Sequence, residues 1–141
     1  MDRSRLIIRL KQKEGLRLTP YRDSLGFWTI CYGHLLAAPW PPSADCDQCD
    51  SYLTRDIDAA EGIASSYAFY GTLDSPRQNV LVELAFNLGN KLKQFHKFLA
   101  ALSAKDYTTA SQELKDSLAY KQEPKRFDEL IDALTTGEYP K

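Results

Sequence analysis

Three oxygen-bearing side chains lie close together near the start of the chain. Glu14 is followed after nine residues by Asp23, and after a further six by Thr29. Two carboxyl groups in different environments can divide acid and base roles between them, as hydrolysis of a glycosidic bond requires. A threonine hydroxyl both donates and accepts hydrogen bonds, so it can hold water beside a carboxylate. The pattern suggests acid-assisted attack of water on a sugar bond.

Glu14 stands where a carboxylate is unfavourable. Residues 3–14 carry an apolar face at helical spacing, and Gly15 follows as a stop signal. Unpaired carbonyls at a helix C-terminus repel a negative charge, and apolar neighbours desolvate it. Glu14 should therefore keep its proton to a higher pH than a free glutamate. Asp23, at a turn, should be wetter and stay ionised.

Each of the three residues also has an ordinary structural reading. Glu14 alone is typical of a solvated helix end, Asp23 of a turn and Thr29 of a strand. Their spacing alone does not decide between these readings and an enzyme.

The elements that position these residues are a hairpin and a series of helices. The hairpin is predicted from Tyr21 to Tyr32 with its turn at 24–26. Alternation puts one set of side chains on one face (Thr29, Cys31, Gly33) and another set opposite (Trp28, Ile30, Tyr32). Further helices are predicted from these signals: Asp45 with Gln48, Ser75-Pro76 to Gly89, about 91–103, Asp106 with Leu118 facing inward, and Glu123-Pro124 to Gly137.

The fold class predicted is mainly α, with a small β element. Residues 1–141 form one domain: a hairpin lobe at 15–45, a connecting helix at 46–70, and a helical lobe of 71–141 plus helix 3–14. A cleft between such lobes suits an extended ligand.

Charge and hydropathy exclude several classes of partner. The net charge is −1, so no overall field attracts nucleic acid or an anionic membrane. No apolar run approaches the roughly 20 residues of a membrane span, and the first residues lack a signal-peptide core. We expect a monomer made and kept in the cytosol, with no nucleic-acid partner, no stable membrane association and no cofactor.

The cysteines leave alternatives open. Cys46 and Cys49 stand at a predicted helix start, where thiol pKa values are lowered, so they suit a redox pair. They also suit half a zinc site with Cys31 or nearby acids, although we expect no metal. Incidental cysteines remain the simplest reading, because three cysteines are too few for a disulfide scaffold.

A longer stretch carries a family resemblance. Residues 14–36, EGLRLTPYRDSLGFWTICYGHLL, are similar to the active-site region of phage-type lysozymes, the endolysin family typified by that of bacteriophage T4. Weaker matches follow in the same order at 54–60, 85–89, 122–126 and 134–137. The resemblance covers nearly the whole chain and implies the T4-lysozyme-like fold.

The resemblance also implies roles. Glu14 would donate a proton, while Asp23 and Thr29 would position the attacking water. The substrate would be bacterial peptidoglycan, cut between N-acetylmuramic acid and N-acetylglucosamine with inversion. Leu35 and Phe86 match positions that contact the glycan. Such an endolysin accumulates in the host cytoplasm and reaches the wall after the membrane is permeabilised.

Three further residues match supporting positions of the family. Arg126 matches an arginine that pairs with the acid, which would lower the pKa of Glu14 and oppose the effect of the helix end. His34 and Asp56 match a stabilising ion pair. The sequence does not settle which influence on Glu14 is stronger.

The chain departs from the family between His34 and Asp56, where it is shorter. The hairpin lobe should be reduced, with residues 37–44 as its remaining wall. Trp40 in that wall suits either a sugar-stacking or a plain loop role. The rival functions are a silent peptidoglycan-binding module, a chitin-type glycosidase and a thiol oxidoreductase.

Overall fold

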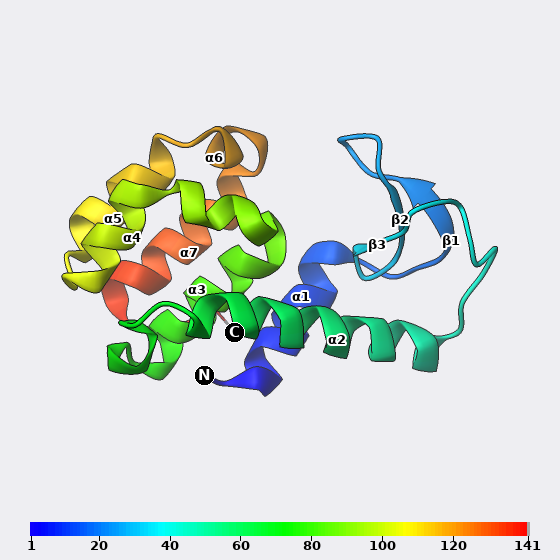
Figure 1. Cartoon of the computed structure of the whole chain (residues 1–141), viewed down its shortest axis with the longest axis horizontal. Helices are drawn as coiled ribbons and strands as arrows, with labels where there is room; N and C mark the ends of the chain where they lie inside the picture. Colours follow the sequence, from blue (N-terminus) through cyan, green and yellow to red (C-terminus); the bar gives the residue numbers. More distant parts are fainter. Residues whose placement is uncertain (141) are drawn as a thin grey trace.

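The computed structural model describes residues 1–140 and is mainly helical with one small antiparallel sheet (Figure 1). This confirms the predicted fold class. The α-helices are α1 (Arg3–Glu14), α2 (Cys46–Ser65), α3 (Ser75–Leu88), α4 (His96–Ser103), α5 (Tyr107–Lys115), α6 (Leu118–Gln122) and α7 (Pro124–Thr136). The strands are β1 (Arg17–Arg22), β2 (Trp28–Cys31) and β3 (His34–Leu35), and two 3-10 helices are η1 (Tyr70–Thr72) and η2 (Gly89–Gln94).

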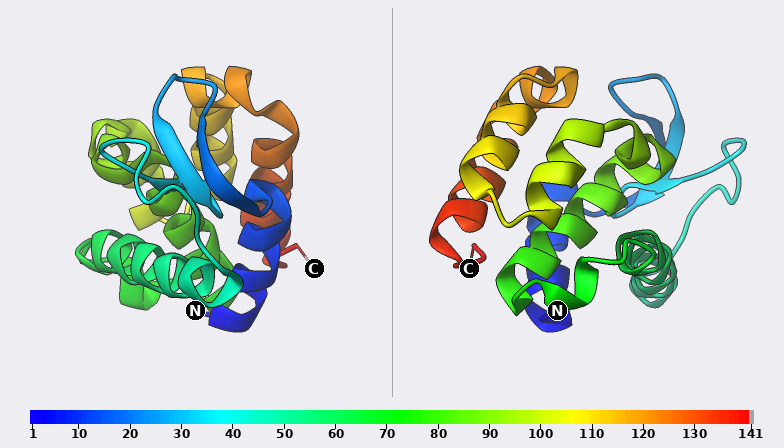
Figure 2. Two further views of the ribbon diagram at one scale, coloured as in Figure 1. Left: turned by 90° about the vertical axis from the view of Figure 1, so that its right-hand side faces the viewer. Right: turned by 60° about the vertical axis from the view of Figure 1, so that its left-hand side comes forward.

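The sheet and the helices α3 to α7 lie at opposite ends of the molecule (Figures 1 and 2). The helix α2 runs from beneath the sheet to the helical end, and α1 leads into the sheet. The strand order is β1-β2-β3, with both pairs antiparallel. The short β3 was not predicted, because two residues are too few to show alternation.

Local end signals account for most helix boundaries. Asp45 and Gln48 form the predicted capping box of α2, with both hydrogen bonds present. Gly89 ends α3 and Gly137 ends α7, as predicted. The helix α2 stops at Ser65, short of the predicted limit at residue 70.

Three predicted helix details are wrong. The helix expected at about 91–103 is instead the 3-10 helix η2 followed by α4, which begins at His96. Asp74, not Ser75, is the N-cap residue of α3, and Gln78 binds the Met1 amino group and the Tyr70 carbonyl instead of completing a capping box. Leu118 does not face inward: Ser117 caps a separate helix α6 there, and Leu118 is 71% exposed.

One large apolar cluster joins α1, α2, α3, α4, α5 and α7. Its largest fully buried members include Phe98, Phe127, Leu81 and Leu84. Full burial of each such side chain stabilises the fold by about 1.5–3 kcal/mol. This cluster fixes α1 and α7 against α3 and thereby sets the positions of Glu14 and Arg126.

A second, small cluster holds the sheet on α2. Ile30, Cys31, Ala44 and Cys49 are its buried members, and Cys31 forms a disulfide with Cys49. Ile30 and Cys31, which the predicted alternation places on opposite faces, are both buried. Thr29 is buried as well, so both faces of β2 are covered at these residues.

The disulfide also corrects the reading of the cysteines. Cys49 faces the sheet and pairs with Cys31, whereas Cys46, at the first residue of α2, is exposed and free. A redox pair of Cys46 with Cys49 is therefore excluded. The thiol oxidoreductase hypothesis therefore loses the cysteine pair on which it rested.

Reduction of the disulfide should destabilise the protein. The bond closes a loop with a sequence separation of 18, for which the chain-entropy model gives about 3 kcal/mol. We expect a lower melting temperature in a strong reductant and in Cys49→Ala, measured by circular dichroism. Cys46→Ala is the control and should melt like the wild type. An unchanged melting temperature after verified reduction would contradict this expectation.

The loop 37–44 projects from the side of the sheet that faces away from the helical end (Figure 2). Trp40 lies in this loop with 74% of its surface exposed. The loop is tied back at Ala44, whose amide donates to the Leu18 carbonyl at 2.9 Å. This placement favours the plain loop role of Trp40.

Candidate active site

Glu14 ends α1 with its side chain 20% exposed. Its Oε1 accepts a hydrogen bond from Arg126 Nη1 at 3.0 Å. Its other oxygen lies against Gly33: a Cβ atom at residue 33 would be 2.6 Å from Glu14 Oε2. The carboxyl is thus held between α7 and the turn that joins β2 to β3.

The pKa of Glu14 is raised above that of an ordinary glutamate. Burial is the largest cause, and the charge and hydrogen bond of Arg126 act in the opposite direction. The two influences left open by the sequence are therefore resolved in favour of the protonated form. A raised pKa is what a general acid needs near neutral pH.

Asp23 lies at the tip of the hairpin, and its Oδ1 holds the turn. The backbone amides of Leu25 and Phe27 both donate to Oδ1 at 2.9 Å. Within residues 1–140, Oδ2 has no hydrogen-bond donor, so this oxygen is available to a water molecule. Oδ1 of Asp23 therefore has a structural role in the turn, whereas Oδ2 remains available for a catalytic role.

Thr29 lies in β2 and is 2% exposed. Its hydroxyl donates to the Phe27 carbonyl at 2.9 Å. Because the hydroxyl proton of Thr29 is already donated to Phe27, the hydroxyl oxygen can only accept a hydrogen bond from a water molecule. Its register partner across the sheet is Tyr21, two residues before Asp23.

A groove of about 330 Å³ joins the sheet to the helices. Leu35 from β3 and Phe86 from α3 both line it, as do Gly33, His34 and Asp56. Leu35 is 61% exposed. A neighbouring cavity of about 500 Å³ shares Ala59, Ile63 and Gly89 with this groove and extends it along α2. Gly33 connects the groove to the acid, because it also contacts the Glu14 carboxyl.

His34 and Asp56 form the ion pair that the resemblance implies. His34 Nδ1 and Asp56 Oδ2 are 2.8 Å apart, with exposed fractions of 22% and 29%. The His34 ring also stacks on Tyr52 at a centroid distance of 4.2 Å. Both partners lie on α2, so His34 fastens β3 to that helix.

Replacing His34 by Asn should lower stability more than activity. The change removes the ion pair and the ring stack, together worth on the order of 1 kcal/mol. We expect a melting temperature lower by several degrees near neutral pH, with most wall-clearing activity retained. Asp58→Asn on the same helix is a control, since Asp58 pairs with Arg3 and not with His34. Lost activity with an unchanged melting temperature would refute a structural role.

A buried ion network behind Glu14 was missed by the sequence reasoning. Glu83, in α3, is fully buried and accepts hydrogen bonds from Arg9 and Arg126. Only one signal pointed to it: an acid within the most apolar helix. Its partners are distant in sequence, so the network shows only in three dimensions.

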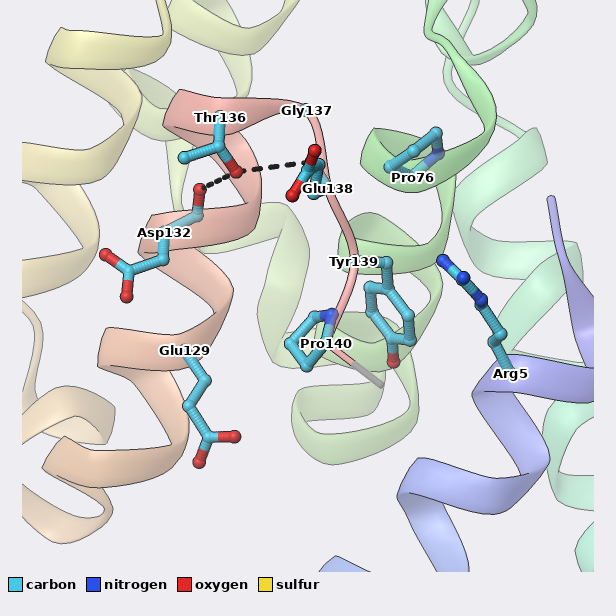
Figure 3. A pocket seen from close by; sticks show the side chains of 9 residues that line it. All are labelled: Arg5, Pro76, Glu129, Asp132, Thr136, Gly137, Glu138, Tyr139 and Pro140. Atoms are coloured by element: carbon cyan, nitrogen blue, oxygen red, sulfur yellow. Dashed lines mark hydrogen bonds between the residues drawn. The ribbon is translucent and has the colours of Figure 1, made fainter.

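A larger cavity of about 710 Å³ lies elsewhere, between α7 and the starts of α1 and α3 (Figure 3). Arg5, Pro76, Glu129 and Tyr139 are among its lining residues. None of the candidate site residues lines it. The groove is lined by Leu35, Phe86, His34 and Asp56, although not by Glu14, Asp23 or Thr29, and it is therefore the better candidate for binding a substrate.

Residues 1–140 contain no cluster of histidine, cysteine and acidic side chains fit to hold a metal ion. No helix in the same range is both long enough and apolar enough to cross a membrane.

Comparison with known proteins agrees with this geometry. The family model described as "Phage lysozyme" matches residues 11–131. The chain belongs to the phage lysozyme family. The "Probable T4-type lysozyme 2" of Dictyostelium discoideum is 27% identical over 91% of this chain and 92% of its own. The "Endolysin" of Acyrthosiphon pisum secondary endosymbiont phage 1 is 27% identical over 76% of this chain and 73% of its own.

A further relative is much longer than this chain. The "Pre-baseplate central spike protein Gp5" of Enterobacteria phage T4 is 26% identical over 91% of this chain, which covers 27% of that protein. As a phage lysozyme, the chain is a lysozyme-type glycosidase. The matched range includes Glu14, Asp23, Thr29, His34, Leu35, Asp56, Phe86 and Arg126.

Proposed function

We propose that this phage lysozyme is a muramidase that hydrolyses the β-1,4 bond between N-acetylmuramic acid and N-acetylglucosamine in peptidoglycan. The observation that carries the proposal is the setting of Glu14. A partly buried acid with a raised pKa touches Gly33, and Gly33 lines the groove between Leu35 and Phe86. A sugar chain in that groove would lie beside the acid.

The reaction runs by single displacement. Glu14 donates its proton to the glycosidic oxygen as the bond from that oxygen to the anomeric carbon breaks. Water attacks that carbon from the opposite face and gives its proton to Asp23, which inverts the configuration. The free Oδ2 of Asp23 and the acceptor lone pairs of Thr29 hold this water. Proton exchange with solvent restores both carboxyl groups.

Product analysis tests the bond and the stereochemistry. Purified sacculi are digested, and the soluble fragments are examined by mass spectrometry and by NMR within the first minutes. We expect N-acetylmuramic acid at the new reducing end, first as the α-anomer. A reducing N-acetylglucosamine end, or an initial β-anomer, would refute the proposed bond or the proposed route.

Two rival functions are separated by the same assay. A silent peptidoglycan-binding module would sediment with sacculi and release no fragments; both carboxyl groups are present, which favours catalysis. A chitin-type glycosidase would release soluble sugars from chitin oligomers at a rate comparable to that from sacculi. We expect slow or no release from chitin.

The biological setting is part of the proposal. We propose a monomer that lyses a bacterial host, accumulating in the host cytoplasm and acting on the wall once the membrane is permeabilised. The Cys31–Cys49 disulfide supports action outside the cytoplasm, since disulfides persist in oxidising compartments.

A further inference from the structure

A fully buried carboxylate lies behind the candidate acid. Glu83 has 0% exposure, in the middle of α3. Arg9 Nε donates to its Oε1 at 2.6 Å, and Arg126 Nε donates to its Oε2 at 3.1 Å. The Tyr139 hydroxyl, from the segment that follows α7, donates to Oε1 as well. Three segments far apart in sequence thus converge on one carboxylate.

A buried carboxylate paired with two arginines is an unfavourable way to stabilise a fold. Burying ions costs several kcal/mol per charge, and apolar replacements of buried ion pairs are often neutral or stabilising. The helical neighbours of Glu83 in α3 show what such a position normally holds. Most of them are buried and apolar (Val80, Leu81, Val82, Leu84 and Ala85), and the other buried polar residue of α3, Asn79, is uncharged. Packing therefore does not account for a charged residue at position 83.

Arg126 connects Glu83 to the site. The same guanidinium group binds Glu83 through Nε and Glu14 through Nη1, and its side chain is only 6% exposed. The planar fork of an arginine fixes the two bonds relative to each other. The position of Arg126 at Glu14 is consequently set by its bond to Glu83.

We propose that Glu83 is a positioning residue for the reaction: it anchors Arg126 and offsets the charge of that arginine, so that Arg126 orients Glu14 without depriving it of its proton. The inference rests on the proposed role of Glu14 as the proton donor. Glu83 itself lies too deep to touch the substrate.

The charges that face Glu14 agree with this role. From α7 it meets Arg126 and, farther off, Glu123; from α3 it feels Glu83; from β1 it meets the uncharged Tyr21. Burial is the largest cause of its raised pKa, Arg126 lowers the pKa, and Glu123 and Glu83 raise it. Removing the charge of Glu83 would leave Arg126 less compensated.

The groups that face Glu83 are two cations and one neutral donor. Arg9 and Arg126 contribute two positive charges, and Tyr139 contributes a neutral donor. Arg9 also binds Glu129 at 2.9 Å, which in turn binds Lys13 at 2.6 Å. Glu129 is 32% exposed, and within residues 1–140 it forms no ion pair with Arg126, so it provides a matched control within the same network.

The test is the pH profile of kcat/KM on solubilised glycan strands at constant ionic strength. The alkaline limb of that profile reports the acid of the free enzyme. In Glu83→Gln we expect the limb to move down by about half to one pH unit, and the plateau rate at low pH to fall as well, because Arg126 loses its charged anchor. Glu129→Gln should leave the limb in place.

A second variant allows the same test if Glu83→Gln does not fold. Arg9→Gln with Glu83→Gln keeps two side chains that can hydrogen-bond each other and removes the buried Arg9 charge together with that of Glu83, while Arg126 keeps Glu14 and Glu123 as partners. We expect the limb to move down in this variant too, by less than in Glu83→Gln, because the more distant Arg9 charge is also gone. A limb that stays in place or moves up in the folded variants would overturn the inference.

Failure of this inference is distinguishable from failure of the proposed function. If Glu14→Gln cleaved glycan like the wild type, the proton-donor role of Glu14 would be refuted, and the inference about Glu83 would be refuted with it. If Glu14→Gln were inactive and the limb of Glu83→Gln did not move, only the inference would fall.

Discussion

Replacing Glu14 by Gln should reduce the rate of wall clearing by about 10²–10⁴-fold, the usual contribution of a general acid. Glutamine keeps the size of the side chain and still accepts the Arg126 hydrogen bond through its amide oxygen, but it has no proton of suitable acidity to give. The measurement is the fall in turbidity of outer-membrane-permeabilised Gram-negative cells.

Glu123→Gln is the matched control. Glu123 also approaches Arg126 Nη1, at 3.5 Å, but its side chain is 47% exposed. We expect near-normal clearing, because this carboxyl has no part in the proposed reaction. Melting curves of both variants should match the wild type within a few degrees. Equal activity of Glu14→Gln and wild type would refute the proton-donor role.

The direction of the pH dependence follows from the raised pKa of Glu14. The protonated form is the active one, so the rate should fall as the pH rises through that pKa. Since the pKa lies above that of an ordinary glutamate, activity should persist to a higher pH than a solvated acid would allow. The alkaline limb of the wild-type profile measures this directly.

Replacing Gly33 by Ala should also reduce activity, by about 10²-fold, the cost of misplacing a reacting group by about 1 Å. The new Cβ would lie 2.6 Å from Glu14 Oε2 and 3.1 Å from its Cδ. The carboxyl is the flexible end of a long side chain, so it will move away rather than unfold the protein. It then loses its place beside the groove.

Gly26→Ala separates this contact from backbone strain. Gly26 and Gly33 both have positive φ, 86° and 70°, but a Cβ at residue 26 meets nothing within 4 Å. Both variants should lose on the order of 1 kcal/mol of stability through strain, and only Gly33→Ala should lose activity. Similar activity in the two variants would show that the close approach does not matter.

The sequence predicted those parts of the fold that depend on local signals. The capping box of Asp45 with Gln48 and the stop at Gly89 follow from neighbouring residues, and the structure contains both. The disulfide of Cys31 with Cys49 and the exposure of Leu118 depend on how distant segments meet. A linear pattern carries no such information.

The candidate site shows the same difference between local features and features that depend on distant segments. The odd position of Glu14 at a helix end is visible in the sequence, and it pointed to an acid. The sign of its pKa shift was not predictable, because it depends on the depth of burial and on where Arg126 reaches it. Glu83 was missed for the same reason: its three partners come from α1, α7 and the segment after α7.

The disulfide also turns residues 31–49 into a covalent ring. The exposed loop 37–44 lies inside that ring. A protease that cuts this loop once therefore leaves two fragments that stay tied together. Such a nicked molecule would run as one band in a gel without reductant and as two bands after reduction. Cleavage in this loop would then break the continuity of the chain but leave the protein as one covalent molecule.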